Sequence, residues 1–234
     1  MHGSTLMYRL LEDYPKEKLH IIEAFGTSSP DSRLAGCEYR ELKTGLSRLL
    51  WTRFHYYVSP IATLGAPIFR HRIPKILGGF RPEAVITVVH GYSWATAAAY
   101  AEQHKLPLHL ILHDECALIA ERLAVERRWI ERRLRHWYPR AASRLCVSPC
   151  MGETYRDRYG AVGDVLYPSR GKDSLFFAKP APSLQGPCAP FTVAFGGPIK
   201  VEYAPALQRI ATALQSRRGR LIVYGPSTTA AVHR

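Results

Sequence analysis

The sequence predicts an α/β protein with a parallel β-sheet and helices on both sides of it. Short apolar strands alternate with segments of helical spacing through residues 1–170, which is typical of such a sheet. Polar residues follow several of these strands, at the position where open α/β sheets bind ligands. After a stretch rich in Lys, Pro, Ser and Ala at 171–190, one further strand–helix–strand unit follows.

The composition is that of a globular protein with a strong positive charge. Hydrophobic residues make up 47% of the 234 residues and aromatic residues 11%, which is enough for a sizeable core. The net charge of +13 favours anionic partners such as nucleic acid, the inner face of a membrane or phosphorylated ligands. The sequence has no apolar run that could span a bilayer, no signal peptide, and five cysteines without a CxxC pair. We therefore expect a reduced, cytoplasmic protein.

The first part of the chain is expected to contain helices and one strand. Ser4 is a suitable N-cap for a helix over 5–13, which would end before Pro15. The apolar residues at 19–24 predict a strand, and 25–40 is expected to be irregular because it contains Gly, Ser, Pro and Asp. Further helices are expected at 42–58 and at 61–77, the latter broken by Pro67 and Pro74.

The central part carries the strongest strand signals. Residues 84–89 form a continuous apolar run, as expected of a strand covered on both faces, and 106–112 form a second one. An alanine-rich helix is expected between them at 92–104. The remaining predicted elements are a strand at 143–147, a helix at 149–159 with Ser148 as its N-cap, and a strand at 164–167.

The segment Arg122–Arg144 is the densest in positive charge and is expected to be helical. Its apolar residues fall on one helical stripe: Ile119, Leu123, Ile130, Leu134 and Trp137. Its arginines are consistent with the solvated face of a surface helix, or with a face that contacts a membrane surface or an anionic acceptor. A nucleic-acid partner is not expected, because the chain has no interleaved aromatics and no known reading module.

Several common catalytic motifs are absent from the sequence. It contains no GxGxxG, GxxxxGK[ST], GxSxG or HExxH motif and no DxD pair for a divalent metal. This argues against classical dinucleotide enzymes, P-loop NTPases, α/β-hydrolases and zincins, and we expect no metal site. The polar strand ends remain as candidate ligand-binding positions: His90-Gly91, His113-Asp114, Ser148 and the segment 167–173.

With these strand ends in order, the chain resembles the GT-B glycosyltransferases, in particular glycosyltransferase family 4. Members of that family carry the elements DvvhvHg, P.vlt.HD, AdrvvavS, vipNGvD and f.ig.vG.l…KG in this order. The corresponding segments here are PEAVITVVHG (82–91), PLHLILHD (107–114), AASRLCVS (141–148), VLYPSRGKD (165–173) and FTVAFGGPIK (191–200). The resemblance covers nearly all of the chain, with Ser169-Arg170 where the family has its asparagine.

The resemblance implies a Rossmann-like acceptor-side domain at 1–172, a linker at 173–190 and a partial nucleotide-sugar domain at 191–234. It also implies a strand ahead of the first helix and a glycine-rich loop that contacts donor and acceptor. Gly3 and Ser4 would be the remnant of that loop and are therefore candidate substrate contacts. The family's paired glutamates, which hold the donor sugar and ribose, would follow Arg234. The implied fold is therefore GT-B-like, with a second Rossmann-like domain represented only by its first βαβ unit.

The implied activity is metal-free and retaining transfer of a sugar from a nucleotide-diphosphate sugar to a saccharide, lipid-linked or other hydroxyl acceptor. No cofactor is implied, and the positive surface fits an enzyme at the inner membrane face, with peripheral contact through Arg122–Arg144. The alternative is a non-catalytic, truncated remnant or fragment of such an enzyme. Measurement of donor-dependent sugar transfer, or of nucleotide-diphosphate binding, by the purified chain separates the two.

His113 is the leading catalytic candidate, and the resemblance assigns a sugar-contacting histidine to about this place. A neutral imidazole could donate a hydrogen bond to a sugar hydroxyl, and a protonated one could neutralise a leaving phosphate. The alternative is a structural histidine bonded to a backbone carbonyl. Asp114 would orient a histidine or cap the following segment. His90 and Gly91 are candidate substrate contacts, or only a polar turn at a helix start.

Gly196, Gly197 and Lys200 are the candidates for binding the donor diphosphate. A glycine turn lets backbone N–H groups approach a phosphate, and a lysine adds charge. The alternative is a plain tight turn between a strand and a helix.

Overall fold

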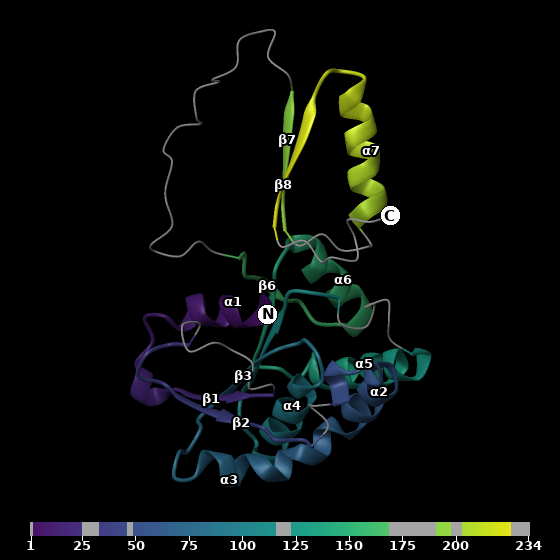
Figure 1. Ribbon diagram of the computed structural model, residues 1–234. Coiled ribbons are helices and arrows are strands. Elements are labelled where there is room, and N and C mark those ends of the chain that lie inside the picture. Colours follow the sequence, from purple (N-terminus) through teal and green to yellow (C-terminus); the bar gives the residue numbers. More distant parts are fainter. Residues whose placement is uncertain are drawn as a thin grey trace. The chain divides into compact units, whose positions relative to one another are not determined.

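The computed structural model describes six segments of the chain (Figure 1): residues 2–24, 33–45, 49–115, 123–168, 191–197 and 203–225. The chain divides into two compact units, Met1–Ser174 and Leu175–Arg234. Each unit combines helices with strands that pair in parallel. The protein is therefore α/β with parallel sheets, as the sequence predicts.

A four-stranded parallel sheet forms the centre of the first unit. Its strands follow chain order: β3 (Val85–Val88), β4 (Leu108–Leu112), β5 (Ser143–Cys146) and β6 (Asp164–Val165). Every neighbouring pair is parallel, so the carboxyl ends of all four strands meet at one edge of the sheet. The polar residues that follow these strands in the sequence therefore lie at this edge.

Helices pack on this sheet and bury its apolar residues. Helix α4 (Ser93–His104) contacts β3 and β4, and α6 (Pro149–Tyr159) contacts β5 and β6. Helix α5 (Ala124–Trp137) packs against α6 and against α2 (His55–Gly65). The largest fully buried hydrophobic side chains are Trp94, Tyr138, Tyr155, Leu110, Ile111, Leu112, Ile130, Leu134 and Val89. The Trp94 and Trp137 rings meet edge to face with centroids 5.7 Å apart, which joins α4 to α5.

A second, two-stranded parallel sheet precedes these elements in the chain. It consists of β1 (His20–Glu23) and β2 (Glu38–Glu41), preceded by α1 (His2–Leu11). The prediction that residues around 38–40 are irregular is wrong. The sequence Glu-Tyr-Arg-Glu has no apolar run, and the strand forms because it pairs with β1 over its full length.

Two helix predictions in this region also need correction. Helix α1 already includes His2, so Ser4 lies inside the helix and the N-cap position must precede His2. The helix expected at 42–58 does not form over that range. Gly45 has a left-handed φ of 79°, which is incompatible with an α-helix there, and the described residues of this range that precede α2 contain a single 3₁₀ turn at Leu49–Trp51.

Helix α2 instead continues through Pro60 and gives up one backbone hydrogen bond there. After it, the predicted breaks at the two later prolines are confirmed. Pro67 stands at the start of a 3₁₀ segment (Ala66–Arg72), and Pro74 at the start of α3 (Ile73–Leu77).

The second unit contains one βαβ element, as predicted. Strands β7 (Thr192–Gly196) and β8 (Arg220–Tyr224) pair in parallel, and α7 (Ala204–Gln215) connects them and packs on β8. The predicted linker and the C-terminal residues after 225 lie outside the described residues. Among the described helices, none combines the length and apolar character needed to cross a bilayer.

Candidate functional site

The candidate site is built at the carboxyl ends of β3 and β4, two neighbouring strands. Val88 of β3 is in register with Ile111 of β4, and the Val89 N–H extends the pairing by donating to the Ile111 carbonyl at 2.8 Å. The residues that follow, His90 on one side and His113 on the other, therefore leave the sheet side by side.

The chain turns sharply after β3. The His90 N–H donates to the Val88 carbonyl at 2.8 Å, and Gly91 has a φ of 62° in the left-handed region. A residue with a side chain would be strained at this φ, so Gly91 serves the turn that leads from β3 into α4. The turn leaves the His90 side chain 55% exposed at the sheet edge.

One carboxylate oxygen contacts both histidines. Asp114 Oδ2 lies 3.1 Å from His113 Nε2 and 3.4 Å from His90 Nδ1. The two imidazole rings lie with their centroids 5.5 Å apart. The structure therefore brings together three of the predicted site residues from two strand ends. The sequence left open whether Asp114 orients a histidine or caps the following segment. Its contacts with both rings place it to orient either histidine.

His113 is the buried member of this cluster. Its side chain is 12% exposed, whereas Asp114 is 49% exposed. Neither His113 ring nitrogen makes a hydrogen bond to any described group, and both nitrogens are shielded from solvent. The contact with Asp114 is close in distance but lacks hydrogen-bond geometry. Among the described residues, no backbone carbonyl accepts a hydrogen bond from His113, so they do not show the structural histidine that was the alternative.

The loop that carries Asp114 is tied to α6 by an ion pair that the sequence gave no reason to expect. Arg158 Nη1 donates to both carboxylate oxygens of Glu115, at 3.2 and 3.1 Å. Both side chains are 28% exposed, so the pair is partly shielded from water. At the amino end of the same helix, Ser148 Oγ accepts a hydrogen bond from the Met151 N–H at 3.2 Å, which confirms Ser148 as the N-cap.

The cluster has two chemical capabilities. Imidazole and carboxylate groups at a sheet edge can exchange hydrogen bonds with the hydroxyls of a bound ligand, and a protonated imidazole can face an anion. The same three groups could hold a metal ion, since His90, His113 and Asp114 offer ligand atoms that all lie within 4.8 Å of one another.

The other predicted site residues are not part of this cluster as described. Gly3 and Ser4 lie within α1, and the structure describes only their backbone. In the second unit, Lys200 also lies outside the described residues. Gly197 has a φ of 148°, which favours glycine, but its N–H donates to the Tyr224 carbonyl at 2.8 Å. That amide is therefore engaged in the sheet and is not available to a phosphate.

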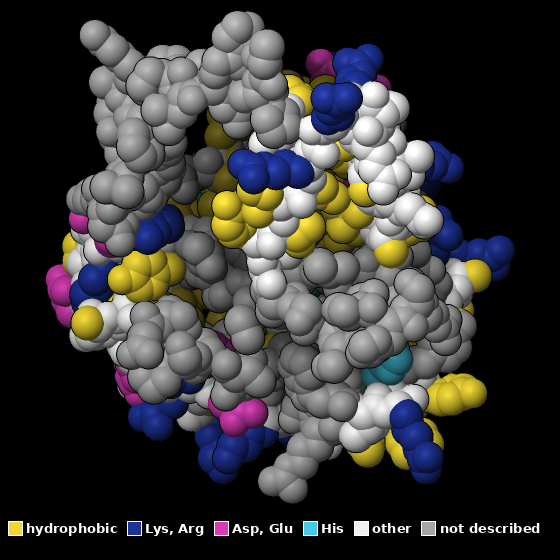
Figure 2. All heavy atoms as spheres, turned by 45° about the horizontal axis from the view of Figure 1, so that its top comes forward, with side chains coloured by type: hydrophobic (Ala, Val, Ile, Leu, Met, Phe, Trp, Pro, Cys, Tyr) yellow, Lys and Arg dark blue, Asp and Glu magenta, His cyan; other side chains and the backbone are white. Residues whose placement is uncertain are grey.

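Part of the arginine-rich segment has a structural role. Arg144 Nη1 donates to the carbonyl of Ala141 at 2.8 Å and its Nε to that of Val162 at 2.9 Å. Arg133 stacks on Trp129 and Trp137, with its guanidinium carbon 5.2 and 5.4 Å from the ring centroids. The predicted apolar stripe is confirmed for Ile130, Leu134 and Trp137, which are buried. Leu123 is instead the extended N-cap residue of α5 and is only partly buried, and Ile119 lies outside the described residues. The exposed arginines of α5 are Arg127, Arg128, Arg132 and Arg135. On the face shown in Figure 2, the described Lys and Arg side chains are dispersed among hydrophobic ones.

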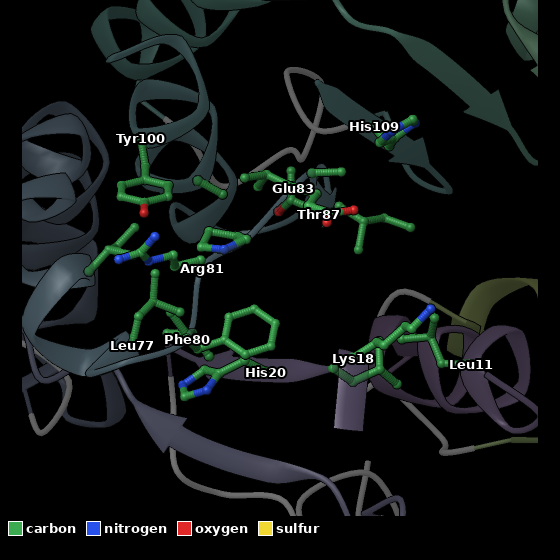
Figure 3. Close-up of a pocket in the computed structure, with 18 of the residues that line it drawn as sticks. Leu11, Lys18, His20, Leu77, Phe80, Arg81, Glu83, Thr87, Tyr100 and His109 are labelled. Carbon is green, nitrogen blue, oxygen red and sulfur yellow. The ribbon is translucent and has the colours of Figure 1, made fainter. Parts of the chain in front are cut away.

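A cavity of about 760 Å³ lies apart from the histidine cluster, between the two sheets of the first unit (Figure 3). Its walls include His20 and Ile22 of β1 and Val85 and Thr87 of β3. Among the described strands, β1 pairs only with β2 and β3 only with β4, so both have an open edge. The His20 side chain is 1% exposed, its ring nitrogens make no hydrogen bond to a described group, and its ring lies 5.4 Å from that of Phe80. No residue pattern in the sequence pointed to this cavity, because it depends on how two sheets are placed.

Comparison of the sequence with known protein families and with characterised proteins finds no match.

Proposed function

We propose that the protein is a GT-B glycosyltransferase that transfers a sugar from a nucleotide-diphosphate sugar to a saccharide or lipid-linked hydroxyl acceptor. The observation that carries the proposal is the convergence of His90, His113 and Asp114 beyond the carboxyl ends of β3 and β4. Open parallel sheets bind their ligands at this edge. The order of the strand-end motifs in the sequence supports the same assignment.

In this proposal, the three side chains bind and orient the sugar. His113 is held at the end of β4 with little freedom, because its side chain is largely buried. Its imidazole donates to a sugar hydroxyl when neutral, and stabilises the leaving diphosphate when protonated. Asp114 contacts both rings and fixes their orientation. Positioning of this kind can supply a large part of a transfer reaction's rate.

The second unit contributes to donor binding in this proposal. Gly196 ends β7 and Gly197 follows it, at the end of a strand where a nucleotide diphosphate could bind. Since the Gly197 amide is already bonded to Tyr224, we assign the diphosphate to Gly196 and Lys200. The exposed arginines of α5 supply the proposed peripheral contact with an anionic membrane surface.

The test uses the purified chain with UDP, GDP and ADP in calorimetry, followed by the matching nucleotide sugars in a diphosphate-release assay. We expect one nucleotide diphosphate to bind with micromolar affinity, and its sugar to be consumed in the presence of acceptor. His113→Ala should lower release about 100-fold or more, as expected for loss of a hydrogen-bond donor that stabilises charge in the transition state. The exposed His104, on α4, provides a matched control whose substitution by alanine should leave release unchanged. Absence of binding by all three diphosphates would overturn the proposal, and binding without release would identify the chain as a non-catalytic remnant.

A further inference from the structure

We propose that His90, His113 and Asp114 form a binding site for a divalent transition-metal ion such as zinc, which accepts imidazole and carboxylate ligands. The inference does not depend on the proposed transferase function, and it gives His113 a different role, because a ring nitrogen that binds a metal ion cannot carry a proton. It also departs from the metal-free site that the sequence resemblance implies.

The spacing of the three groups is that of metal ligands. Two ligands on a tetrahedral zinc with bonds near 2.0–2.2 Å are separated by about 3.3 Å. Asp114 Oδ2 lies 3.1 Å from His113 Nε2 and 3.4 Å from His90 Nδ1, so two of the three edges already match. All three ligand atoms lie within 4.8 Å of one another. Only His90 needs to move closer to His113, and its side chain is 55% exposed and so has room to turn.

The unsatisfied nitrogens of His113 point to the same conclusion. Buried polar atoms are nearly always hydrogen-bonded, and an exception in a folded protein calls for an explanation such as a bound ion. Both His113 ring nitrogens are shielded from solvent and make no hydrogen bond to a described group. A metal ion at Nε2 would satisfy one of them and would also compensate the adjacent carboxylate of Asp114.

A backbone turn and a side-chain ion pair hold the ligands in place without the metal. Gly91 fixes the turn that presents His90, and the Arg158–Glu115 ion pair ties the Asp114 loop to α6. A site whose ligands are held by the fold loses less conformational entropy when the ion binds. Two imidazoles and one carboxylate leave at least one coordination position open, which is the arrangement of ligand-binding rather than closed structural zinc sites. The open position would accept an oxygen of a hydroxyl, phosphate or water ligand.

The test is titration of the untagged, reduced chain with Zn²⁺ in calorimetry, and with Co²⁺ as a visible-absorbing probe. We expect one ion per chain with micromolar affinity, and zinc-dependent shifts of the His90 and His113 imidazole signals in ¹H–¹⁵N spectra. His90→Ala, His113→Ala and Asp114→Asn should each weaken binding about 10-fold or more. His104→Ala should leave binding unchanged, which separates this site from non-specific histidine binding.

His90 and Asp114 are about half exposed, so their variants should keep the fold, as checked by circular dichroism, even if His113→Ala does not. The proposal is overturned if neither ion binds below millimolar concentration, or if His90→Ala and Asp114→Asn both bind like the parent chain. Metal binding is measured here without nucleotide sugar, and sugar transfer can be measured in EDTA. Failure of one proposal is therefore distinguishable from failure of the other.

Discussion

Thr63 donates its hydroxyl to Glu126 Oε1 at 2.7 Å, and both side chains are only 1% exposed. Ser59 donates to the same oxygen at 3.2 Å, so two hydroxyls of α2 reach one carboxylate of α5. Glu126 stands in the first turn of α5, where the positive end of the helix dipole favours a carboxylate. A buried charge is costly unless it is compensated in this way, so this contact holds α2 against α5.

Replacing Thr63 by valine keeps the shape of the side chain and removes the hydroxyl. Glu126 then loses its shorter hydrogen bond inside the core, and we expect the free energy of unfolding to fall by about 1–3 kcal/mol. Urea unfolding monitored by circular dichroism measures this change. Thr154 is exposed on α6, so Thr154→Val should alter stability by less than about 0.5 kcal/mol. Equal stability of the two variants would contradict the role given to the contact.

Gly163 is required because other groups approach it closely. A Cβ built there would lie 2.8 Å from Tyr138 Oη and 3.0 Å from Cys146 Sγ. Gly163→Ala should therefore overpack this region and lower the free energy of unfolding by about 1–3 kcal/mol. Gly65→Ala is the matched control, since a Cβ there meets nothing within 4 Å and its φ of −81° suits alanine. The control should be neutral or slightly more stable, and a loss of stability at Gly65 as large as at Gly163 would refute the packing argument.

Glu102 should make stability depend on pH in acid. Burial alone would raise the pKa of Glu102, but hydrogen bonds from His136 and Trp137, with the nearby charges of His136 and Arg140, outweigh it and lower the pKa. A carboxyl whose pKa is lower in the folded chain adds stability above its unfolded pKa, about 4.3, and loses it as pH falls through the folded value. The parent chain should thus be more stable than Glu102→Gln at pH 7, and this stability difference should shrink as the pH falls below the unfolded pKa.

Urea unfolding of both chains between pH 7 and pH 3 measures this difference. Glu102 is 51% exposed, so the effect should be small and should shrink further at high salt. If the stability difference between the two chains stays constant with pH or grows in acid, the hydrogen bonds do not stabilise the ionised form of Glu102.

The elements predicted best are those with a strong local signal. The apolar runs before His90 and His113 are strands β3 and β4, and the cap at Ser148 is where α6 begins. In these segments hydrophobic pattern and capping agree, so local sequence is sufficient. Because the strands are parallel and adjacent, placing the two histidines at one sheet edge also followed from the sequence.

The parts that were missed depend on contacts between distant segments. Strand β2 has a charged sequence and forms through its pairing with β1. From the sequence, Glu126 is expected on the surface of an arginine-rich helix. Its burial is explained by the hydroxyls of Thr63 and Ser59, which donate hydrogen bonds to it. The Arg158–Glu115 pair joins residues 43 positions apart, which no local pattern reveals.

The cavity in Figure 3 is bordered in the way that the place of a further β-strand would be. It lies between β1 and β3, each with an open edge, and Ile86 of β3 is 38% exposed. An apolar strand in this cavity would pair with both edges and would be covered on both faces, as strands within parallel sheets are.

We expect a strand-forming extension to stabilise the chain. About five Val, Ile and Thr residues, joined to Met1 through a Gly-containing turn, should raise Tm by at least about 4 °C, corresponding to 1–2 kcal/mol. Fluorescence of a dye that binds exposed apolar surface should fall at the same time. The control extension has the same length and composition except for two prolines, which cannot donate to a strand ladder and should leave both readings unchanged. If both extensions give the Tm and dye fluorescence of the parent chain, the cavity does not accept a strand.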